Sequence, residues 1–165
     1  IQIEREELAE LRSHANYVID TSSLKVAEMN SELDKLFGSK TKKASFVPNL
    51  MSFGYKHGLR AEADWVIDVR FIPNPYYVSS LKKLTGNNKK VAQYVMKQDI
   101  TKEFVNRFHE IIARLLPCYV KEGKYSLTIA FGCTGGQHRS VALANEFYKI
   151  FTAEGWRVTL EHREL

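Results

Sequence analysis

The residues best suited to chemistry lie in one glycine-rich segment, Gly132-Cys133-Thr134-Gly135-Gly136-Gln137-His138-Arg139-Ser140. This segment joins an apolar stretch typical of a strand to a pattern typical of a helix, and such junctions bind ligands in α/β sheets. Adjacent glycines let successive backbone N–H groups point into one concavity, and a helix N-terminus adds partial positive charge. Together with the guanidinium of Arg139, these features predict an anion site, for which phosphate is the best fit.

Two well-known phosphate motifs do not match this segment. A Walker loop needs Gly-Lys-Ser/Thr where this chain has His138-Arg139-Ser140, and the dinucleotide fingerprint Gly-x-Gly-x-x-Gly does not occur in the sequence. The spacing from Cys133 to Arg139 does match the Cys-x5-Arg loop of cysteine phosphatases, in which a thiolate attacks phosphorus. The alternative interpretation of Cys133 is a small residue packed at a strand end. Phosphatase chemistry by Cys133 and Arg139 is therefore a competing hypothesis to ligand binding without catalysis.

Two further segments follow apolar stretches and could complete the site. In one of them, Arg70 and Asn74 come directly after a predicted strand, and Asp68 is placed to orient Arg70. The alternative for Asp68 and Arg70 is an ordinary ion pair that braces a proline turn. In the other segment, Lys56 and His57 lie between two glycines and could hydrogen-bond the hydroxyls of a phosphorylated ligand.

The elements that must position these residues alternate between strands and helices, which predicts an α/β fold with a mostly parallel sheet flanked by helices. We expect strands over 44–53, 65–69, 126–131 and 156–161, of which the second is apolar enough to be buried on both faces. We expect helices over 78–84, 88–98, 101–121 and 139–154. Pro48 should place its strand at an edge or a bulge, and Pro117 should kink or end the long helix near Leu116.

The charge of the 165-residue chain, +5 overall, is unevenly distributed. Residues 1–38 hold eight acidic and four basic side chains, whereas residues 39–165 carry a net charge of +9. The sign changes at a short polar, basic stretch that is typical of a linker. Before it, a strand over 17–20 and a helix over 24–37 form only part of an α/β unit. The basic part of the chain favours a polyanionic partner.

The composition excludes several classes of protein. A hydrophobic content of 44% is too high for intrinsic disorder, and two cysteines cannot form a disulfide framework. No apolar run approaches the ~18 residues needed to span a membrane. We therefore expect one main domain in a cytoplasmic protein, with no membrane contact and no metal site.

Motifs in the same order along nearly the whole chain resemble the RapZ family of RNase adaptor proteins, also called YvcJ-type nucleotide-binding proteins. These motifs are Ser52-Phe53-Gly54-Tyr55-Lys56-His57-Gly58, Asp68-Val69-Arg70-Phe71-Ile72-Pro73-Asn74-Pro75-Tyr76-Tyr77, Leu84-Thr85-Gly86 and the segment 132–140. The resemblance implies that residues 39–165 are the C-terminal domain, an α/β fold similar to a phosphofructokinase subdomain. It implies that residues 1–38 are the remnant of an N-terminal P-loop kinase-like domain. ATP and GTP would then bind to the full-length protein through a P-loop that this chain lacks, and no cofactor is expected here.

The resemblance also implies a regulatory role rather than an enzymatic one. The domain would sense a phosphorylated amino sugar, similar to glucosamine-6-phosphate, or a sugar nucleotide. It would also bind small RNA and act with a ribonuclease or another regulatory protein, controlling the metabolism of amino sugars and cell-envelope precursors. A homo-oligomer is expected, because family members self-associate. The expected ligand residues are His57, Asp68, Arg70, Asn74, Cys133, Thr134, Gly135, Gly136, Gln137, His138, Arg139 and Ser140. From the basic charge after residue 39, and not from the family's motifs, the expected RNA-binding residues are Lys40, Lys42, Lys43, Arg157 and Arg163.

Overall fold

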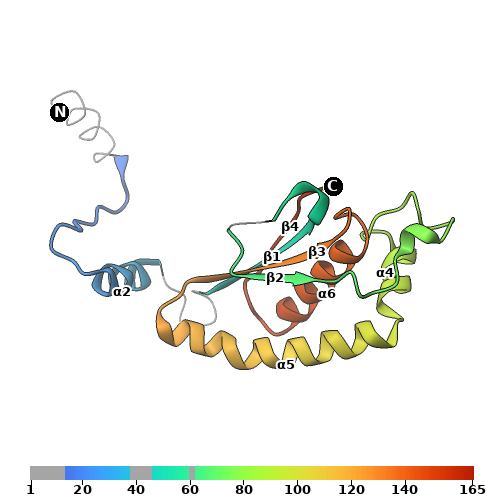
Figure 1. Cartoon of the computed structure of the whole chain (residues 1–165). Coiled ribbons are helices and arrows are strands. Elements are labelled where there is room, and N and C mark those ends of the chain that lie inside the picture. Colours follow the sequence, from blue (N-terminus) through green and yellow to red (C-terminus); the bar gives the residue numbers. More distant parts are fainter. Residues whose placement is uncertain (1–13, 38–45, 60–61) are drawn as a thin grey trace. The chain divides into compact units, whose positions relative to one another are not determined.

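The computed structural model describes residues 14–37, 46–59 and 62–165 (Figure 1). The chain divides into two compact units, Ile1–Gly38 and Ser39–Leu165, at the place where the net charge changes sign. The first unit contains helix α2 (Val26–Phe37), close to the helix predicted for 24–37. The strand predicted for 17–20 does not form among the described residues of this unit. A strand needs a partner for its backbone N–H and C=O groups, and those described residues supply none.

The second unit is built on a four-stranded parallel sheet, which confirms the predicted α/β class. The strands are β1 (Val47–Gly54), β2 (Trp65–Asp68), β3 (Ser126–Cys133) and β4 (Thr159–His162), in the spatial order β2-β3-β1-β4. Because all pairs are parallel, the C-terminal ends of the strands lie at one edge of the sheet. The register pairs Gly54 with Cys133 and Asp68 with Gly132. The three segments that sequence analysis singled out therefore leave the sheet at the same edge.

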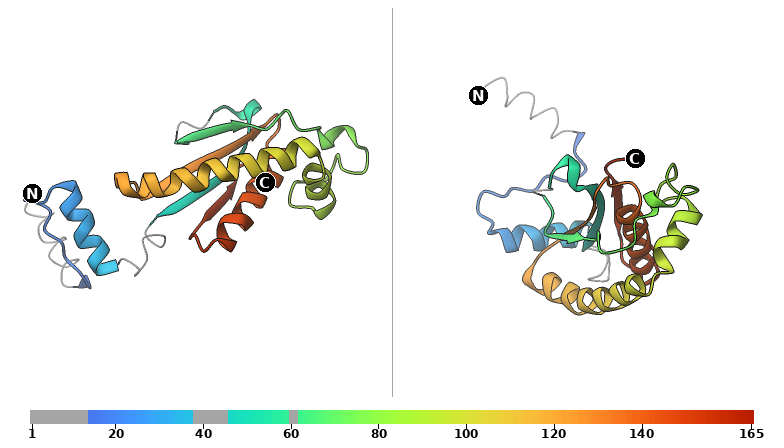
Figure 2. Two further views of the ribbon diagram at one scale, coloured as in Figure 1. Left: turned by 90° about the horizontal axis from the view of Figure 1, so that it is seen from below. Right: turned by 45° about the vertical axis from the view of Figure 1, so that its right-hand side comes forward.

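Helices connect the strands and cover the sheet (Figures 1 and 2). They are α4 (Lys89–Met96), α5 (Asp99–Glu122) and α6 (Arg139–Ala153), with the short 3-10 turns η1 (Tyr55–His57) after β1 and η2 (Pro75–Tyr77) after β2. The two longest helices pack on the same face of the sheet, because Phe108 of α5 and Phe147 of α6 both contact Phe131 of β3. Their apolar stripes form the main core, which fixes where α6 begins. None of the helices in the described part of the chain is long and apolar enough to cross a membrane.

Several details of the predicted elements were wrong. The segment 78–84 forms turns rather than a helix, and α5 continues past Pro117 to Glu122. The buried side chain of Leu116 anchors α5 to the core just before the proline, so the loss of one backbone hydrogen bond does not end the helix. Strand β2 is an edge strand with alternating burial, rather than a strand buried on both faces, because only β3 lies beside it.

Pro48 lies in an interior strand, contrary to the expectation of an edge or a bulge. The backbone N–H of Val47 donates to the carbonyl of Tyr125, on the side of β1 that faces β3. The N–H of the next residue in a strand faces the other side, where pairing with β4 begins only at Asn49. The proline therefore lies before the ladder on that side begins and removes no hydrogen bond from it.

Candidate functional site

The loop between β3 and α6 surrounds the sulfur of Cys133 with hydrogen-bond donors. The hydroxyl of Ser140 lies 3.1 Å from Sγ of Cys133, and the backbone N–H groups of Gly136, His138 and Ser140 act to lower the pKa of that thiol. Gly136 has a φ of 74°, which favours glycine, whereas Gly135 does not adopt a positive φ. Only one of the two adjacent glycines therefore adopts a left-handed conformation.

These donors stabilise negative charge on Cys133. Burial by itself would raise the pKa of the Cys133 thiol. Hydrogen bonds from the Ser140 hydroxyl, and from the N–H groups of Ser140, Gly136 and His138, outweigh burial and lower that pKa below its ordinary value. The N-terminus of α6, a helix of 15 residues, adds a favourable dipole. The loop thus combines donors and a helix dipole that favour negative charge.

A cavity of about 310 Å³ adjoins this loop. Residues that follow three different strands line it: Lys56 after β1, then Asn74, Tyr76 and Tyr77 after β2, and Cys133, Thr134, Gly135, Gln137, His138 and Arg139 after β3. None of the described residues that line the cavity is acidic, so its charged side chains are Lys56 and Arg139. Its volume lies at the small end of the range for ligand pockets, roughly 300–1,000 Å³. The cavity therefore suits a small, negatively charged ligand.

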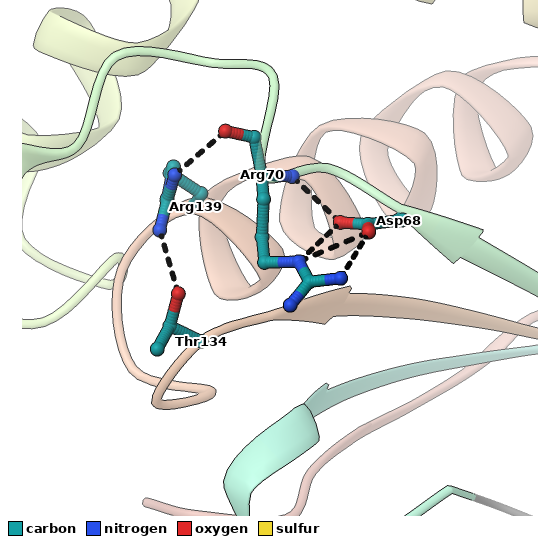
Figure 3. Close-up of polar contacts among 4 residues, drawn as sticks. All are labelled: Asp68, Arg70, Thr134 and Arg139. Carbon is teal, nitrogen blue, oxygen red and sulfur yellow. Dashed lines mark hydrogen bonds and ion pairs between the residues drawn. The ribbon is translucent and has the colours of Figure 1, made fainter.

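Arg139 ties two sides of this site together. It is only 5% exposed. Its Nη1 donates to the backbone carbonyl of Arg70 at 3.0 Å, and its Nη2 donates to Oγ1 of Thr134 at 3.3 Å (Figure 3). Its Nη1 also donates to the backbone carbonyl of Ile72 at 3.0 Å. Its Nε is buried and has no partner among the described residues. Most N–H groups of the guanidinium, which we expected to bind phosphate, therefore donate to protein acceptors. These bonds hold the turn after β2 against the loop after β3.

Asp68 and Arg70 form an ion pair outside the lining of the cavity. Nε of Arg70 lies 3.0 Å from both carboxylate oxygens of Asp68 and Nη2 lies 2.6 Å from one of them (Figure 3). The guanidinium also stacks on Tyr55, 4.4 Å from the centre of the ring. The hydrogen bond from Arg70 lowers the pKa of Asp68. This geometry is that of the bracing pair considered as the alternative in the sequence analysis.

The other expected ligand residues lie at different depths around the cavity. Asn74 lines it, and its side-chain oxygen accepts a hydrogen bond from the backbone N–H of Tyr76. His57 is exposed and does not line the cavity. Gly136 and Ser140 shape the loop without lining the cavity.

The part of the chain that the structure describes contains no cluster of three His, Cys, Asp or Glu residues able to hold a metal ion.

Sequence reasoning missed two cavity residues, Tyr76 and Tyr77, which are 48% and 84% exposed. They directly follow Asn74-Pro75, and exposed aromatic side chains are a common feature of binding sites. Lys56 was considered beside His57, and the structure places only Lys56 on the cavity wall.

One glycine outside the loop also determines its position. The backbone N–H of Gly86 donates to the carbonyl of Gln137 at 2.8 Å. A Cβ atom at residue 86 would lie 2.4 Å from the carbonyl oxygen of His138 and 2.7 Å from the backbone nitrogen of Ala142. Such close approach of two backbones is possible only with glycine, so Gly86 lets its segment contact the start of α6.

The expected RNA-binding residues are only partly described. Lys40, Lys42 and Lys43 lie outside the described residues. Arg157 is exposed after α6. Arg163 is exposed after β4, and its backbone N–H donates to the carbonyl of Ser52.

Comparison with known proteins agrees with the motifs noted in the sequence. A family model described as the RapZ C-terminal domain matches residues 46–165. A nucleotide-binding protein of Caldanaerobacter subterraneus subsp. tengcongensis is 47% identical over 165 residues, which is 100% of this chain and 58% of that protein. A nucleotide-binding protein of Symbiobacterium thermophilum is 48% identical over 100% of this chain and 55% of its own length. A nucleotide-binding protein of Alkaliphilus oremlandii is 45% identical over 99% of this chain and 57% of its own length. The chain therefore spans little more than half the length of these relatives.

Proposed function

The chain belongs to the RapZ C-terminal domain family, and on that premise we propose that residues 39–165 form a regulatory sensor of a phosphorylated amino sugar. The ligand is glucosamine-6-phosphate, a close analogue or a sugar nucleotide. The observation that carries this proposal is the cavity beside the loop after β3. It combines a helix N-terminus, Lys56 and a concentration of backbone N–H groups, and none of the described residues in its lining is acidic.

Each part of such a ligand has a counterpart in the cavity wall. The phosphate is attracted by Lys56 and by the loop at the start of α6. The apolar face of a sugar ring packs on an aromatic ring, and an ammonium group is attracted to the same surface. Tyr77 offers such a ring, because it is 84% exposed, whereas Nζ of Lys82 already lies 4.6 Å from the centre of the Tyr76 ring. The free amide donors of Asn74 can meet a sugar hydroxyl.

Isothermal titration calorimetry with glucosamine-6-phosphate tests this proposal, and glucosamine without phosphate serves as the ligand control. We expect Lys56→Met to weaken binding at least about tenfold, because a hydrogen bond to a charged group contributes roughly 1.5–3 kcal/mol. Lys121→Met is the matched control, since Lys121 is exposed on α5 and does not line the cavity. Equal heats for the two sugars, or equal losses for the two variants, would show that the cavity is not the phosphate site.

We further propose that small RNA binds over the acid-free stretch between Asp68 and Asp99. This stretch of 30 residues contains Arg70, Lys82, Lys83, Lys89, Lys90 and Lys97 and no Asp or Glu. Its five lysines are exposed, and they adjoin in sequence the exposed rings of Tyr76 and Tyr77. Lysines that neutralise phosphates, combined with aromatic rings that stack on bases, are typical of single-stranded RNA binding.

The salt dependence of RNA affinity tests this second half of the proposal. The slope of log affinity against log salt should fall by about 1–2 when Lys82 and Lys83 are both changed to Ala, because each phosphate contact contributes roughly 0.7–0.9 to the slope. Lys121→Ala should leave the slope unchanged. If the double variant has the same slope as the wild type, RNA does not contact this surface.

We place the remaining functions of the full-length protein outside this chain. The relatives are named nucleotide-binding proteins, and we propose that ATP or GTP binds to a P-loop domain of which residues 1–38 are the remnant. The full-length protein would be a cytoplasmic homo-oligomer that acts on amino-sugar and cell-envelope precursor metabolism through a ribonuclease or another regulatory protein. Truncation of a full-length relative after the P-loop domain should retain nucleotide binding and abolish sugar-phosphate binding.

The competing function is a phosphatase that uses Cys133 and Arg139. The hydrogen bonds to Sγ of Cys133 favour it, because they stabilise the nucleophilic thiolate. Against it, most donors of Arg139 are held by protein acceptors, and none of the described residues lining the cavity is a carboxylic acid that could protonate a leaving group. Hydrolysis of p-nitrophenyl phosphate that is abolished by Cys133→Ser would establish the phosphatase.

A further inference from the structure

A second cavity, separate from the cavity beside the loop after β3, lies between helices α4 and α6. Its volume is about 430 Å³, within the range of roughly 300–1,000 Å³ for ligand pockets. The two helices pack beside each other, and the turn that contains Gly86 and Asn87 forms a further wall. None of the described residues lines both cavities, so the two can be tested separately.

Two asparagines that line this second cavity are bonded to each other. Nδ2 of Asn145, on α6, donates to Oδ1 of Asn87 at 2.8 Å. This bond uses one N–H of Asn145 and fixes the orientation of both amide groups. Asn87 keeps its Nδ2 donors and Asn145 keeps Oδ1 as an acceptor. The cavity wall therefore holds a hydrogen-bond donor beside an acceptor.

Asn87 does not take part in starting α4, although it lies just before that helix. The cap of α4 is the next residue, Asn88, whose side-chain oxygen accepts a hydrogen bond from the backbone N–H of Lys90 at 3.0 Å. The side chain of Asn87 instead contacts Asn145, which is 58 residues away in sequence. Local structure thus leaves the amide of Asn87 free for recognition.

The remaining wall of the cavity suits a flat, uncharged ring. Ala92 and Met96 of α4 and Ala142 of α6 supply apolar surface. The two alanines are small, which leaves room between the helices, and a methionine sulfur makes favourable contacts with aromatic rings.

The charges of the lining place a neutral group inside the cavity and phosphates outside it. Glu146 is the acidic residue among the described residues of the lining, and its carboxylate disfavours an anion within the cavity. Lys149 pairs with Glu146 at 3.4 Å, and its side chain is 69% exposed. Lys89 also lines the cavity, is exposed, and belongs to the acid-free stretch proposed above to bind RNA.

We propose that this cavity binds one unstacked adenine base of single-stranded RNA, while the RNA backbone follows the lysines of the acid-free stretch. Adenine carries an amino group beside a ring nitrogen, and side-chain amides bond both of these groups together. The amino group donates to Oδ1 of Asn145, and the ring nitrogen accepts from Nδ2 of Asn87. Uracil in the same orientation brings a carbonyl oxygen against the acceptor and an N–H against the donor. The inference rests on the RNA-binding half of the proposed function.

Fluorescence anisotropy with labelled hexa-adenylate and hexauridylate tests the proposal on the whole chain. The wild type should bind hexa-adenylate at least about fivefold more tightly, which is the lower limit of discrimination by one bidentate contact. Asn145→Leu removes the acceptor and should abolish this preference. Ala92→Leu keeps both amides but fills the cavity with a residue that favours helices, and it should have the same effect.

Gln93→Leu is the matched control, because Gln93 is exposed on α4 and does not line the cavity. It should keep the preference of the wild type. Stacking within free hexa-adenylate is the same for every variant, so the comparison among variants isolates the contribution of the cavity.

Each outcome decides between the base pocket and the RNA surface. If either Asn145→Leu or Ala92→Leu is folded by circular dichroism and keeps the wild-type preference, the base is not read in this cavity. Equal binding of both oligonucleotides by the wild type, with a steep salt dependence, overturns the base pocket and leaves the RNA surface in place. Absence of binding to either oligonucleotide overturns the RNA-binding half of the proposed function and this inference with it.

Discussion

Gly86→Ala should destabilise this site, whereas Gly135→Ala should not. The glycine-rich pattern of the loop, taken alone, would predict that Gly135 is the more sensitive of the two positions. Gly86→Ala places a Cβ atom 2.4 Å from the carbonyl oxygen of His138 and 2.7 Å from Cβ of Val141. Restoring ordinary contact distances requires the start of α6 to move by about 1 Å. The movement also strains the 2.8 Å hydrogen bond from Gly86 to Gln137. Overpacking costs about 1–3 kcal/mol and the lost hydrogen bond about 1 kcal/mol.

We therefore expect Gly86→Ala to lower the free energy of unfolding by about 3 kcal/mol and Tm by about 6–12 °C. Affinity for glucosamine-6-phosphate should fall at least about tenfold, because the displaced loop no longer presents its donors correctly. Thermal unfolding followed by circular dichroism and calorimetric titration measure the two effects.

Gly135→Ala is the matched control within the loop itself. A Cβ atom there would meet only Cε of Lys56, at 3.8 Å, and the residue does not adopt a positive φ. The unfolding free energy should stay the same or rise by about 0.4–1 kcal/mol, because alanine restricts the unfolded chain. The reasoning is refuted if Gly86→Ala melts within about 2 °C of the wild type, or if Gly135→Ala is equally destabilised.

Three other substitutions test the electrostatics of the fold. Arg139→Lys should lose about 2–4 kcal/mol of unfolding free energy in urea denaturation, because a single ammonium nitrogen cannot stand where both Nη1 and Nη2 do and leaves acceptors of Arg139 unpaired. A loss below about 0.5 kcal/mol would show that the bracing contacts are unimportant. Burial lowers the pKa of His162 below its usual 6.5, so the unfolded chain binds the proton more readily and stability should fall as the pH drops through 6.5. His162→Asn should flatten that fall between pH 7 and 5, and an unchanged profile would contradict this account. The hydrogen bond from Lys124 lowers the pKa of Asp64 below 3.8, so Asp64→Asn should cost no more than about 1 kcal/mol at pH 7. That cost should shrink as the pH falls below 3.8, whereas a constant difference would exclude the ion pair as its source.

Local sequence patterns predicted the class of the fold, because each depends on short-range physics. The alternation of apolar stretches with helical stripes is sufficient for an α/β assignment. The resemblance to the RapZ family is confirmed by the match to the RapZ C-terminal domain. Pro48 shows where such reasoning stops, since the effect of a missing N–H depends on whether a neighbouring strand has begun at that point, and only the register with β4 determines this.

The sequence by itself predicted an anion site in the segment after Phe131, because glycines, an arginine and a helix start lie within a few residues of one another. Tertiary structure alone decided how those groups are used. The guanidinium of Arg139 donates to the carbonyls of Arg70 and Ile72, some 70 residues away in sequence, and the hydroxyl of Ser140 lies 3.1 Å from Sγ of Cys133. Buried donors bond to whichever acceptors the packing of distant segments brings within reach, and no local pattern encodes that outcome.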